Sequence, residues 1–135
     1  ESAFSAAYAI AAAADKIYLP STGSVGSIGT VIMQVDRTKS NELAGVKYNL
    51  IKSGAKKTDG SPHEPLSDAA RADLQATVDE KSAMFISLVA SRRSLSEATV
   101  RGTEAGIFSA AAALKLGLVD GIARFDDVIA QFKPA

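Results

Sequence analysis

Residues 4–20 read Phe-Ser-Ala-Ala-Tyr-Ala-Ile-Ala-Ala-Ala-Ala-Asp-Lys-Ile-Tyr-Leu-Pro, and they introduce the two kinds of element that the rest of the chain repeats. Alanine is the best helix former and serine is common at helix N-termini, so residues 4–14 predict a helix that begins close to Ser5. Residues 15–20 contain strand-forming side chains and end at a proline, which predicts a short strand.

The first half of the remaining chain continues this alternation of strands and helices. Its predicted elements are, in chain order, a glycine-containing loop (21–29), a buried strand (30–35), a helix (36–44) with Asp36 as its cap and Gly45 as its stop, a strand (46–52) and a loop (53–65).

The second half is mostly helical. Its longest helix begins at Ser67 or Asp68 and runs to about Arg92, with an apolar face at helical spacing. The other predicted elements are a helix (96–101) capped by Ser96, an extended piece (107–108), a helix (109–116) closed by Gly117, a strand or turn (118–121) and a helix (125–132). Strands that alternate with helices predict an α/β fold with a parallel sheet. Because the strands are few, we expect further strands upstream of residue 1, which makes residues 1–135 the C-terminal portion of one domain.

The composition excludes several classes of function. The 135 residues carry 15 Lys and Arg against 15 Asp and Glu, so bulk charge does not favour nucleic acid as a partner. The absence of cysteine and the single histidine, His63, argue against thiol nucleophiles and zinc sites. The longest apolar run, residues 6–14, is far shorter than the roughly 20 residues that span a bilayer. The glycines of residues 23–29 match no phosphate-binding loop, so no cofactor is predicted.

A nucleophile in this chain would have to be a serine or threonine, activated by His63 or by a lysine. His63 lies in a polar loop between two prolines, where an exposed histidine without a catalytic role is the simpler interpretation. A lysine must be neutral to accept a proton. Residues 47–57 hold four lysines and no acid, and repulsion between Lys56 and Lys57 predicts a lowered pKa for at least one of them. A solvated basic loop is the alternative.

Ser5 combines a hydroxyl with the start of a helix. Backbone N–H groups at that position stabilise negative charge, so Ser5 could act as a nucleophile whose next N–H faces an oxyanion. A plain capping serine is the alternative.

Four motifs in the same order resemble the signal peptide peptidase A (protease IV) family of serine peptidases. Residues 5–17 resemble its nucleophile helix, in which Ser-Gly-Gly-Tyr-Tyr-Ile-Ala leads into Ala-Asp-Lys-Ile. Residues 26–34 are similar to its Gly-Ser-Ile-Gly-Val-Ile-Met-Gln stretch, residues 51–59 to its Lys-Ser-Gly-x-x-Lys segment, and residues 110–120 to its Ala-x-x-Leu-Gly-Leu-Val-Asp ending. The Lys-Thr-Asp-Gly-Ser-Pro of residues 57–62 most resembles the phage branch, the minor capsid or head maturation peptidases called protein C.

The resemblance implies a ClpP/crotonase-like fold and a Ser-Lys catalytic dyad. Matched position by position, the nucleophile is Ser5, the general base is Lys57, the serine that orients this lysine is Ser27, and one oxyanion donor is the N–H of Ala6. The second donor belongs in the family to a glycine upstream of residue 1. No metal and no cofactor take part. The implied partners are a polypeptide substrate and further copies of the chain, with active sites near subunit contacts.

Two departures support an alternative function. Ala6-Ala7 replaces the Gly-Gly of the family, and Phe4 replaces a small residue before the nucleophile. A catalytically impaired, structural capsid-associated protein is therefore the second hypothesis, and an acyl-CoA enzyme on the same fold is the third. The phage branch implies a location in the host cytoplasm or procapsid. The cellular branch implies membrane association as part of a longer chain, with signal-peptide remnants as substrates.

Overall fold

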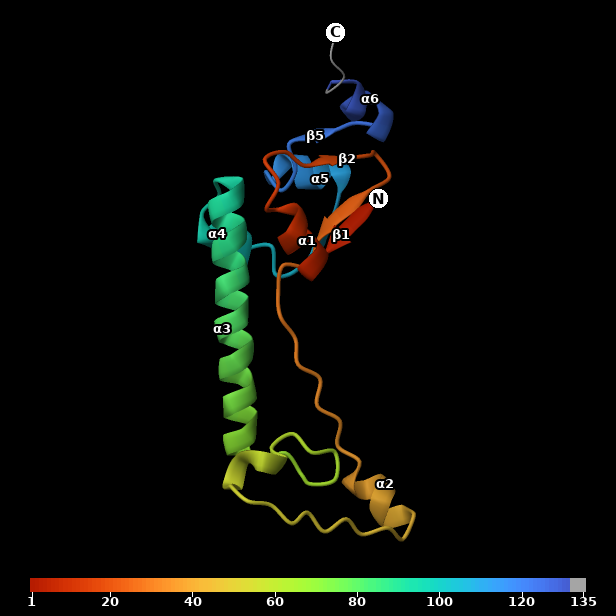
Figure 1. The fold of residues 1–135 in the computed structure, drawn as a ribbon, viewed down its shortest axis with the longest axis vertical. Coiled ribbons are helices and arrows are strands. Elements are labelled where there is room, and N and C mark those ends of the chain that lie inside the picture. Colours follow the sequence, from red (N-terminus) through yellow and green to blue (C-terminus); the bar gives the residue numbers. More distant parts are fainter. Residues whose placement is uncertain (132–135) are drawn as a thin grey trace. The chain divides into compact units, whose positions relative to one another are not determined.

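The computed structural model describes residues 1–131, which form two compact units (Figure 1). The sheet unit contains residues 1–30 and the chain from Lys81 onward. The insertion unit contains Val31–Glu80, so it interrupts the sheet unit in the sequence.

The strands of the sheet unit are short and form two small sheets. The first sheet has the order β1 (Ser2–Phe4), β3 (Ser24–Gly26), β4 (Ile107–Ser109). β1 is parallel to β3, whereas β4 is antiparallel to β3. The second sheet pairs β2 (Tyr18–Leu19) with β5 (Gly121–Ile122) in parallel. The α/β class is confirmed, but the expectation of a purely parallel sheet is wrong, because β4 runs back along β3.

One helix contacts strands of both sheets, and another contacts a strand of the first sheet. α5 (Ala110–Lys115) contacts β3, β4 and β5, and α1 (Ala6–Ala11) contacts β1 (Figure 1). The other helices that contribute to the unit are the C-terminal part of α3 (Asp68–Arg93), α4 (Glu97–Arg101) and α6 (Phe125–Ala130).

The core of the sheet unit is built from one aromatic residue, branched aliphatics and alanines. Its largest fully buried side chains are Tyr8, Leu118, Val25, Val89, Val100 and Val119. Buried alanines such as Ala12 and Ala113 allow the helices to approach closely. The Tyr8 hydroxyl donates a 2.7 Å hydrogen bond to the Leu118 carbonyl, which satisfies the one polar atom of this side chain. Burial raises the pKa of Tyr8 to about 12, against the lowering effect of Arg93, so the phenol stays a donor.

A partly buried carboxylate connects three segments of the sheet unit. Asp120 accepts hydrogen bonds from Arg93 (2.7 Å), from the N–H of Ile17 (2.8 Å) and from Lys16 (3.3 Å). The Arg93 side chain is only 7% exposed, so this pair is shielded from solvent more than an ordinary surface pair. Burial alone would raise the pKa of Asp120, but these hydrogen bonds outweigh it and hold the pKa at about 2.

The insertion unit is mostly irregular. It holds α2 (Thr38–Leu43), the 3-10 helix η1 (Ala55–Thr58) and the first turns of α3. Asp36 accepts from the N–H and the hydroxyl of Thr38, but the N-cap residue of α2 is Arg37, so the prediction of Asp36 as the cap is wrong by one residue. These hydrogen bonds lower the pKa of Asp36.

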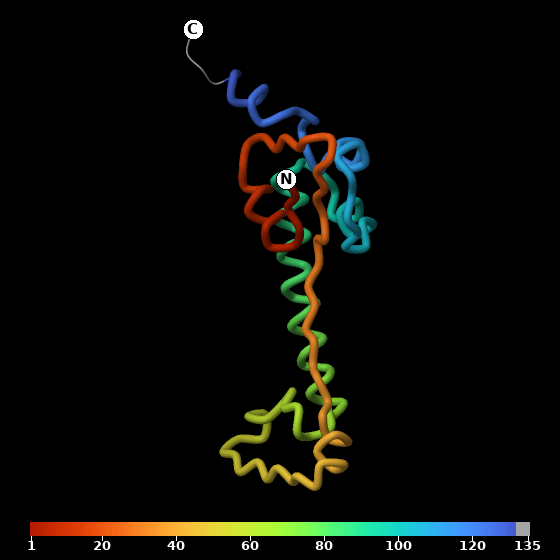
Figure 2. Tube along the Cα trace, turned by 90° about the vertical axis from the view of Figure 1, so that its right-hand side faces the viewer, coloured from red at the N-terminus to blue at the C-terminus, as the bar shows by residue number. Residues whose placement is uncertain are grey.

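Two strands predicted from the sequence are absent from the described structure. Residues 31–35 are extended but belong to no sheet (the orange trace in Figure 2), and Val31 is 86% exposed. Residues 46–52 are irregular as well. β-Branched and alternating residues favour extended backbone, but a strand also needs a neighbour to pair with, and none of the residues described in the structure supplies one. Conversely, β3 forms within residues 21–29, which were expected to be a loop, and β1 lies at the start of the chain, where no strand was predicted.

Helix caps were predicted more successfully. α3 begins after Ser67, whose Oγ accepts from the N–H of Ala70 (3.1 Å), and α4 begins after Ser96, whose Oγ accepts from Thr99 (3.0 Å). Gly117 ends α5 with φ 77°. α6 agrees with the predicted helix over Phe125–Ala130, whereas Phe132 lies outside the described residues.

Replacing Asp120 by Asn should destabilise the protein at neutral pH by about 2 kcal/mol or more, because Arg93 loses its anionic partner. The native pKa lies below the unfolded value of about 3.9, so the contribution of Asp120 is present above that pH and is lost as pH falls toward 2. The melting-temperature difference between wild type and Asp120→Asn should therefore shrink between pH 6 and pH 2. The exposed Asp126→Asn is the control, and a difference constant over this range would contradict the role given to Asp120.

Candidate active site

Ser5 occupies the junction between β1 and α1 in an uncommon backbone conformation. Its φ of 52° and ψ of −124° lie in a region that is strained for a residue with a side chain. The Ser5 N–H donates to the Gly26 carbonyl (2.9 Å), and the Ser5 carbonyl accepts from the N–H groups of Tyr8 (2.9 Å) and Ala9 (3.1 Å). The backbone of Ser5 is thus fixed from both sides, by the neighbouring strand and by its own helix.

The hydroxyl of Ser5 is exposed and does not cap α1. Ser5 is the N-cap residue of this helix, yet its side chain accepts no hydrogen bond there. Ser67 and Ser96 precede helices in the same way, and both use their Oγ as a cap. The alternative interpretation of Ser5 as a plain capping serine is therefore wrong, and its Oγ is available for chemistry.

Ser27 lies beside Ser5 at the same edge of the sheet. β1 and β3 are parallel, and Phe4 is paired with Gly26, so the two serines follow paired residues at the carboxyl ends of adjacent strands. Ser27 also has a positive φ, 55°. Its N–H donates to the Gly106 carbonyl (2.8 Å). The structure thus brings together two of the residues that the sequence singled out.

Ala6 is the first residue of α1, immediately after Ser5. The first N–H groups of an α-helix have no acceptor within the helix. Ala6 and Ala7 have helical backbone and neither has a positive φ, so alanine is accommodated here without strain. The replacement of the family's Gly-Gly by Ala6-Ala7 therefore does not strain the backbone of this turn.

Lys57 lies on η1 in the insertion unit, with an exposed side chain. Since it belongs to a different unit from Ser5 and Ser27, the dyad stays a prediction. Lys57 differs from its neighbours in its contacts. Lys56 forms an ion pair with Asp73, and Lys52 lies 3.7 Å from Glu64, whereas within residues 1–131 no acid lies within 4.0 Å of the Lys57 ammonium.

The pKa of Lys56 moves against the sequence-based expectation. Its hydrogen bond and charge interaction with Asp73 raise the pKa, so this lysine is held as a cation. The pattern around Lys56 did not reveal this partner, because Asp73 belongs to α3, 17 residues further along the chain. Lys56 is therefore a poor base.

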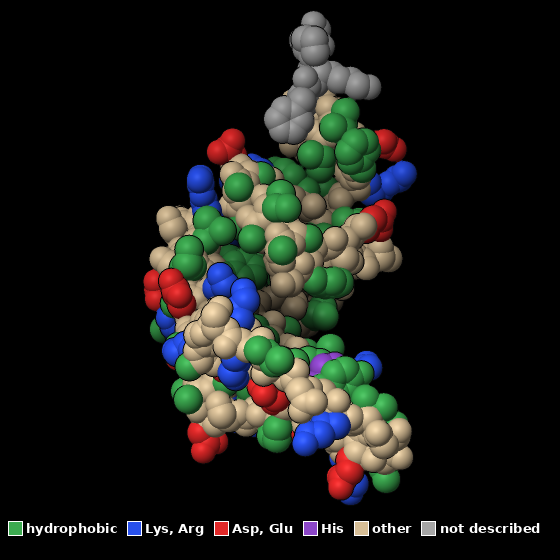
Figure 3. Space-filling model, turned by 60° about the horizontal axis from the view of Figure 1, so that its bottom comes forward, with side chains coloured by type: hydrophobic (Ala, Val, Ile, Leu, Met, Phe, Trp, Pro, Cys, Tyr) green, Lys and Arg blue, Asp and Glu red, His purple; other side chains and the backbone are tan. Residues whose placement is uncertain are grey.

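His63 has a different environment from that of a catalytic-triad histidine. Its ring stacks on Tyr48 with centroids 3.7 Å apart and an angle of 18° between planes. Its Nδ1 lies 3.0 Å from the Asn41 amide nitrogen. Figure 3 shows this side chain (purple) at the surface, next to hydrophobic side chains. In the described chain no serine hydroxyl bonds to this ring, which supports a loop histidine without a catalytic role, although its side chain is half-buried and not exposed as expected.

Other kinds of site receive no support from residues 1–131. No group of three or more His, Cys, Asp or Glu side chains is arranged to hold a metal ion. No helix in this range is both long and apolar enough to cross a membrane.

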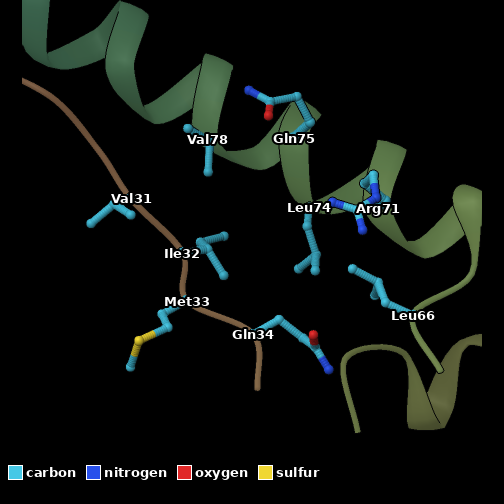
Figure 4. A pocket seen from close by; sticks show the side chains of 9 residues that line it. All are labelled: Val31, Ile32, Met33, Gln34, Leu66, Arg71, Leu74, Gln75 and Val78. Carbon is cyan, nitrogen blue, oxygen red and sulfur yellow. The ribbon is translucent and has the colours of Figure 1, made fainter. Parts of the chain in front are cut away.

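The insertion unit also contains a groove of about 530 Å³, lined by both apolar and polar side chains (Figure 4). Ile32 points from the extended segment toward Leu74 on α3, whereas Val31 and Met33 point away from the helix. Residues 31–34 alternate as a strand does, and their backbones form no hydrogen bond with the rest of the described chain. The segment therefore presents an unpaired edge.

Sequence reasoning missed the backbone groups that position the two serines. Gly26 and Gly106 supply the carbonyls that bind Ser5 and Ser27, and a Cβ on Gly26 would lie 2.3 Å from the Gly106 carbonyl oxygen. The turn before Gly106 holds two further residues with positive φ, Glu104 and Ala105. Only the glycines themselves gave a signal, and it did not say which carbonyls they would present.

The sequence of this chain is similar to those of known peptidases. Residues 1–135 match the sequence family described as Peptidase family S49. The chain belongs to peptidase family S49. It is 35% identical over 135 residues to the head-tail preconnector protein GP5 of Enterobacteria phage P21, covering 100% of this chain and 27% of that protein. It is 34% identical over 131 residues to the capsid assembly protease C of Escherichia phage lambda, covering 97% and 30%.

A cellular relative matches at similar identity. A protein of Enterococcus faecium with the provisional name signal peptide peptidase SppA is 31% identical over 132 residues, covering 97% of this chain and 38% of that protein. The resemblance inferred from the four motifs, including its phage branch, is thereby confirmed. This S49 chain spans less than a third of the length of the two phage relatives.

Replacing Gly26 by Ala should destabilise the protein by about 2 kcal/mol or more, because the new Cβ meets a carbonyl oxygen and φ is 131°. Gly45→Ala is the matched control, since Gly45 also has a positive φ (67°) but open space around it, and it should cost only about 1 kcal/mol. Urea unfolding measures both, and equal losses would show that the Gly106 contact does not constrain β3.

Proposed function

We propose that this chain carries the Ser-Lys dyad of a serine endopeptidase with a ClpP/crotonase-like fold. Ser5 is the nucleophile, Lys57 the general base, Ser27 the residue that orients Lys57, and the Ala6 N–H an oxyanion donor. The observation that carries the proposal is the Ser5 hydroxyl, which is exposed and does not cap α1. Ser5 has a strained backbone and lies at a strand–helix junction. Membership of peptidase family S49 supplies the reaction class.

The proposed reaction begins with proton transfer. The neutral amine of Lys57 takes the proton of Ser5 Oγ while Oγ bonds to the peptide carbonyl carbon. The electron pair of the C=O bond moves to oxygen, and this oxyanion accepts a hydrogen bond from the Ala6 N–H. The Lys57 ammonium then protonates the leaving nitrogen as the C–N bond breaks. Water, activated by Lys57, hydrolyses the acyl-enzyme and returns the proton to Ser5.

The contacts of the lysines support Lys57 as the base. A base must lose its proton readily, and a neighbouring carboxylate opposes that loss. Lys52 and Lys56 each lie beside an acid, whereas Lys57 does not within the described chain. The position of Ser27 also supports the proposed site, because Ser27 and Ser5 follow paired residues at the carboxyl ends of adjacent strands.

The proposed substrate is a polypeptide. An unpaired extended segment such as residues 31–34 is the kind of edge to which an extended peptide can add as a strand. Since one relative is named capsid assembly protease C, we propose a phage scaffold or capsid protein as substrate, with signal-peptide remnants as the cellular alternative. Assembly into a homo-oligomer, in the host cytoplasm or procapsid, belongs to the same proposal.

A second candidate is a structural capsid-associated role without catalysis. The relative named head-tail preconnector protein favours it, because that name states a structural function. A fluorophosphonate probe separates the two functions, since it labels only an activated serine. Labelling that is lost in Ser5→Ala supports the peptidase, whereas wild-type protein that never reacts supports the structural role. An acyl-CoA enzyme would show a thermal shift with acyl-CoA.

Ser5→Ala should lower the hydrolysis of fluorescein-labelled casein by the intact protein about 1,000-fold or more, because no other hydroxyl takes its place. Ser2→Ala in β1 is the matched control and should retain wild-type activity. If Ser5→Ala cleaves casein at the rate of Ser2→Ala, Ser5 is not the nucleophile.

Lys57→Arg should inactivate the enzyme to a similar extent while it preserves the charge and length of the side chain. Arginine stays protonated at all accessible pH values and cannot act as a base. Lys39→Arg on α2 controls for the same chemical change at an exposed position. Activity of Lys57→Arg above a tenth of wild type would rule out Lys57 as the base.

A further inference from the structure

The turn that carries Lys57 has no hydrophobic anchor. η1 spans four residues, Ala55–Thr58, and none of them is buried. Its backbone is held by local turn hydrogen bonds, from the Lys57 N–H to the Gly54 carbonyl (3.3 Å), from Asp59 to Lys56 (3.2 Å) and from Ser61 to Thr58 (2.9 Å), all within a few residues. Apolar burial normally fixes an element in a domain, so another interaction has to define where Lys57 lies.

Side-chain hydrogen bonds supply that interaction. The hydroxyl of Thr58, the residue next to Lys57, donates to Glu64 Oε2 (2.9 Å) and accepts from Lys52 Nζ (2.6 Å). Lys52 Nζ also lies 3.7 Å from Glu64 Oε2. These three residues form the Lys52–Thr58–Glu64 triad, which connects the chain before η1, η1 itself and the chain after it. Thr58 is the central member, because its hydroxyl hydrogen-bonds to both of the other side chains.

The triad closes a loop around the turn. In Figure 1 this part of the chain is yellow to yellow-green, and it lies beside the first turn of α3. All three members of the triad line a pocket of about 240 Å³, together with residues at the start of α3. Lys56 adds a second attachment through Asp73 on α3. Lys56, which is adjacent to the proposed base, and Lys52, which is five residues before it, thus each form an ion pair with a carboxylate.

We propose that Thr58, held by Lys52 and Glu64, is a positioning residue for Lys57. The inference rests on the proposed function of Lys57 as the general base. Thr58 does not contact the reacting atoms: it fixes the η1 backbone so that the adjacent lysine is presented in one position. The triad also occupies Lys52 and Glu64 with each other, which keeps the Glu64 carboxylate engaged and leaves the ammonium of Lys57 without an acid partner.

Substitutions of Thr58 in the intact protein test this role. Thr58→Val keeps the shape of the side chain but removes the hydroxyl, and kcat for casein should fall about 10-fold or more through misplacement of the base, with KM changed less than twofold. Thr58→Ser restores the hydroxyl and should recover most of the loss. Thr38→Val is the control, since Thr38 on α2 makes a comparable bond to Asp36 (2.6 Å), and its kcat should not change. Glu64→Gln provides a second variant should Thr58→Val fail to fold, and it should lower kcat in the same sense.

A readout independent of activity separates positioning from general stability. Amide hydrogen exchange of residues 55–59 should be faster in Thr58→Val than in wild type or Thr58→Ser, while exchange in α3 stays unchanged. Faster exchange throughout the chain would indicate a general loss of stability and overturn the positioning role. So would equal kcat values for Thr58→Val and Thr58→Ser.

Including Lys57→Arg in the same series distinguishes failure of this inference from failure of the proposed function. If Lys57→Arg is inactive but Thr58→Val has wild-type kcat, the triad does not position the base and the dyad remains supported. If Lys57→Arg is active, the dyad assignment is wrong and the inference falls with it. Loss in Lys57→Arg, partial loss in Thr58→Val and recovery in Thr58→Ser together support both.

Discussion

The short parallel ladder between β1 and β3 determines where the candidate nucleophile lies. The ladder ends with Phe4 opposite Gly26, and the hydrogen bond from the Ser5 N–H to the Gly26 carbonyl extends it by one residue. A strand of three residues has little stability of its own, so the placement of Ser5 depends on this neighbour. β4 lies on the other side of β3, and Gly106, the residue before β4, fixes Ser27 in the same way. Backbone hydrogen bonds, more than side-chain packing, therefore arrange this edge of the sheet.

Two strained residues lie at the same place. Ser5 and Ser27 both have φ values above 50°, whereas Gly26, the last residue of β3, has a φ of 131° that only glycine adopts readily. In a serine such conformations cost about 1–3 kcal/mol each and persist where surrounding contacts over-determine them. Here each strained serine donates its N–H to a carbonyl of a neighbouring segment. At Ser5 the consequence is chemical: its backbone turns away from the geometry in which a serine caps its own helix, and the hydroxyl is left exposed.

Local signals in the sequence were sufficient for the helices but not for the sheets. Ser67, Ser96 and Gly117 mark helix ends through contacts within a few residues, and these predictions were confirmed. β1 and β3 are too short to show a period of two, and residues 30–35 show strand propensity without a partner. For the candidate site, too, local signals were sufficient only in part. The motif resemblance identified the family, but no local pattern showed that the Ser5 hydroxyl does not cap its helix or that Lys56 pairs with Asp73.

The two halves of the proposed dyad are held by different physical interactions. Ser5 is fixed by main-chain hydrogen bonds inside a unit with a continuous apolar core, and Ala6 and Ala7 continue its backbone as ordinary helix. Lys57 lies on a turn without buried residues, held by hydroxyl, ammonium and carboxylate groups at the surface. Exposed ion pairs are individually weak, about 0–1 kcal/mol each, and are screened by salt. The position of the base is therefore open to adjustment by few substitutions, whereas the position of the nucleophile is set by the fold.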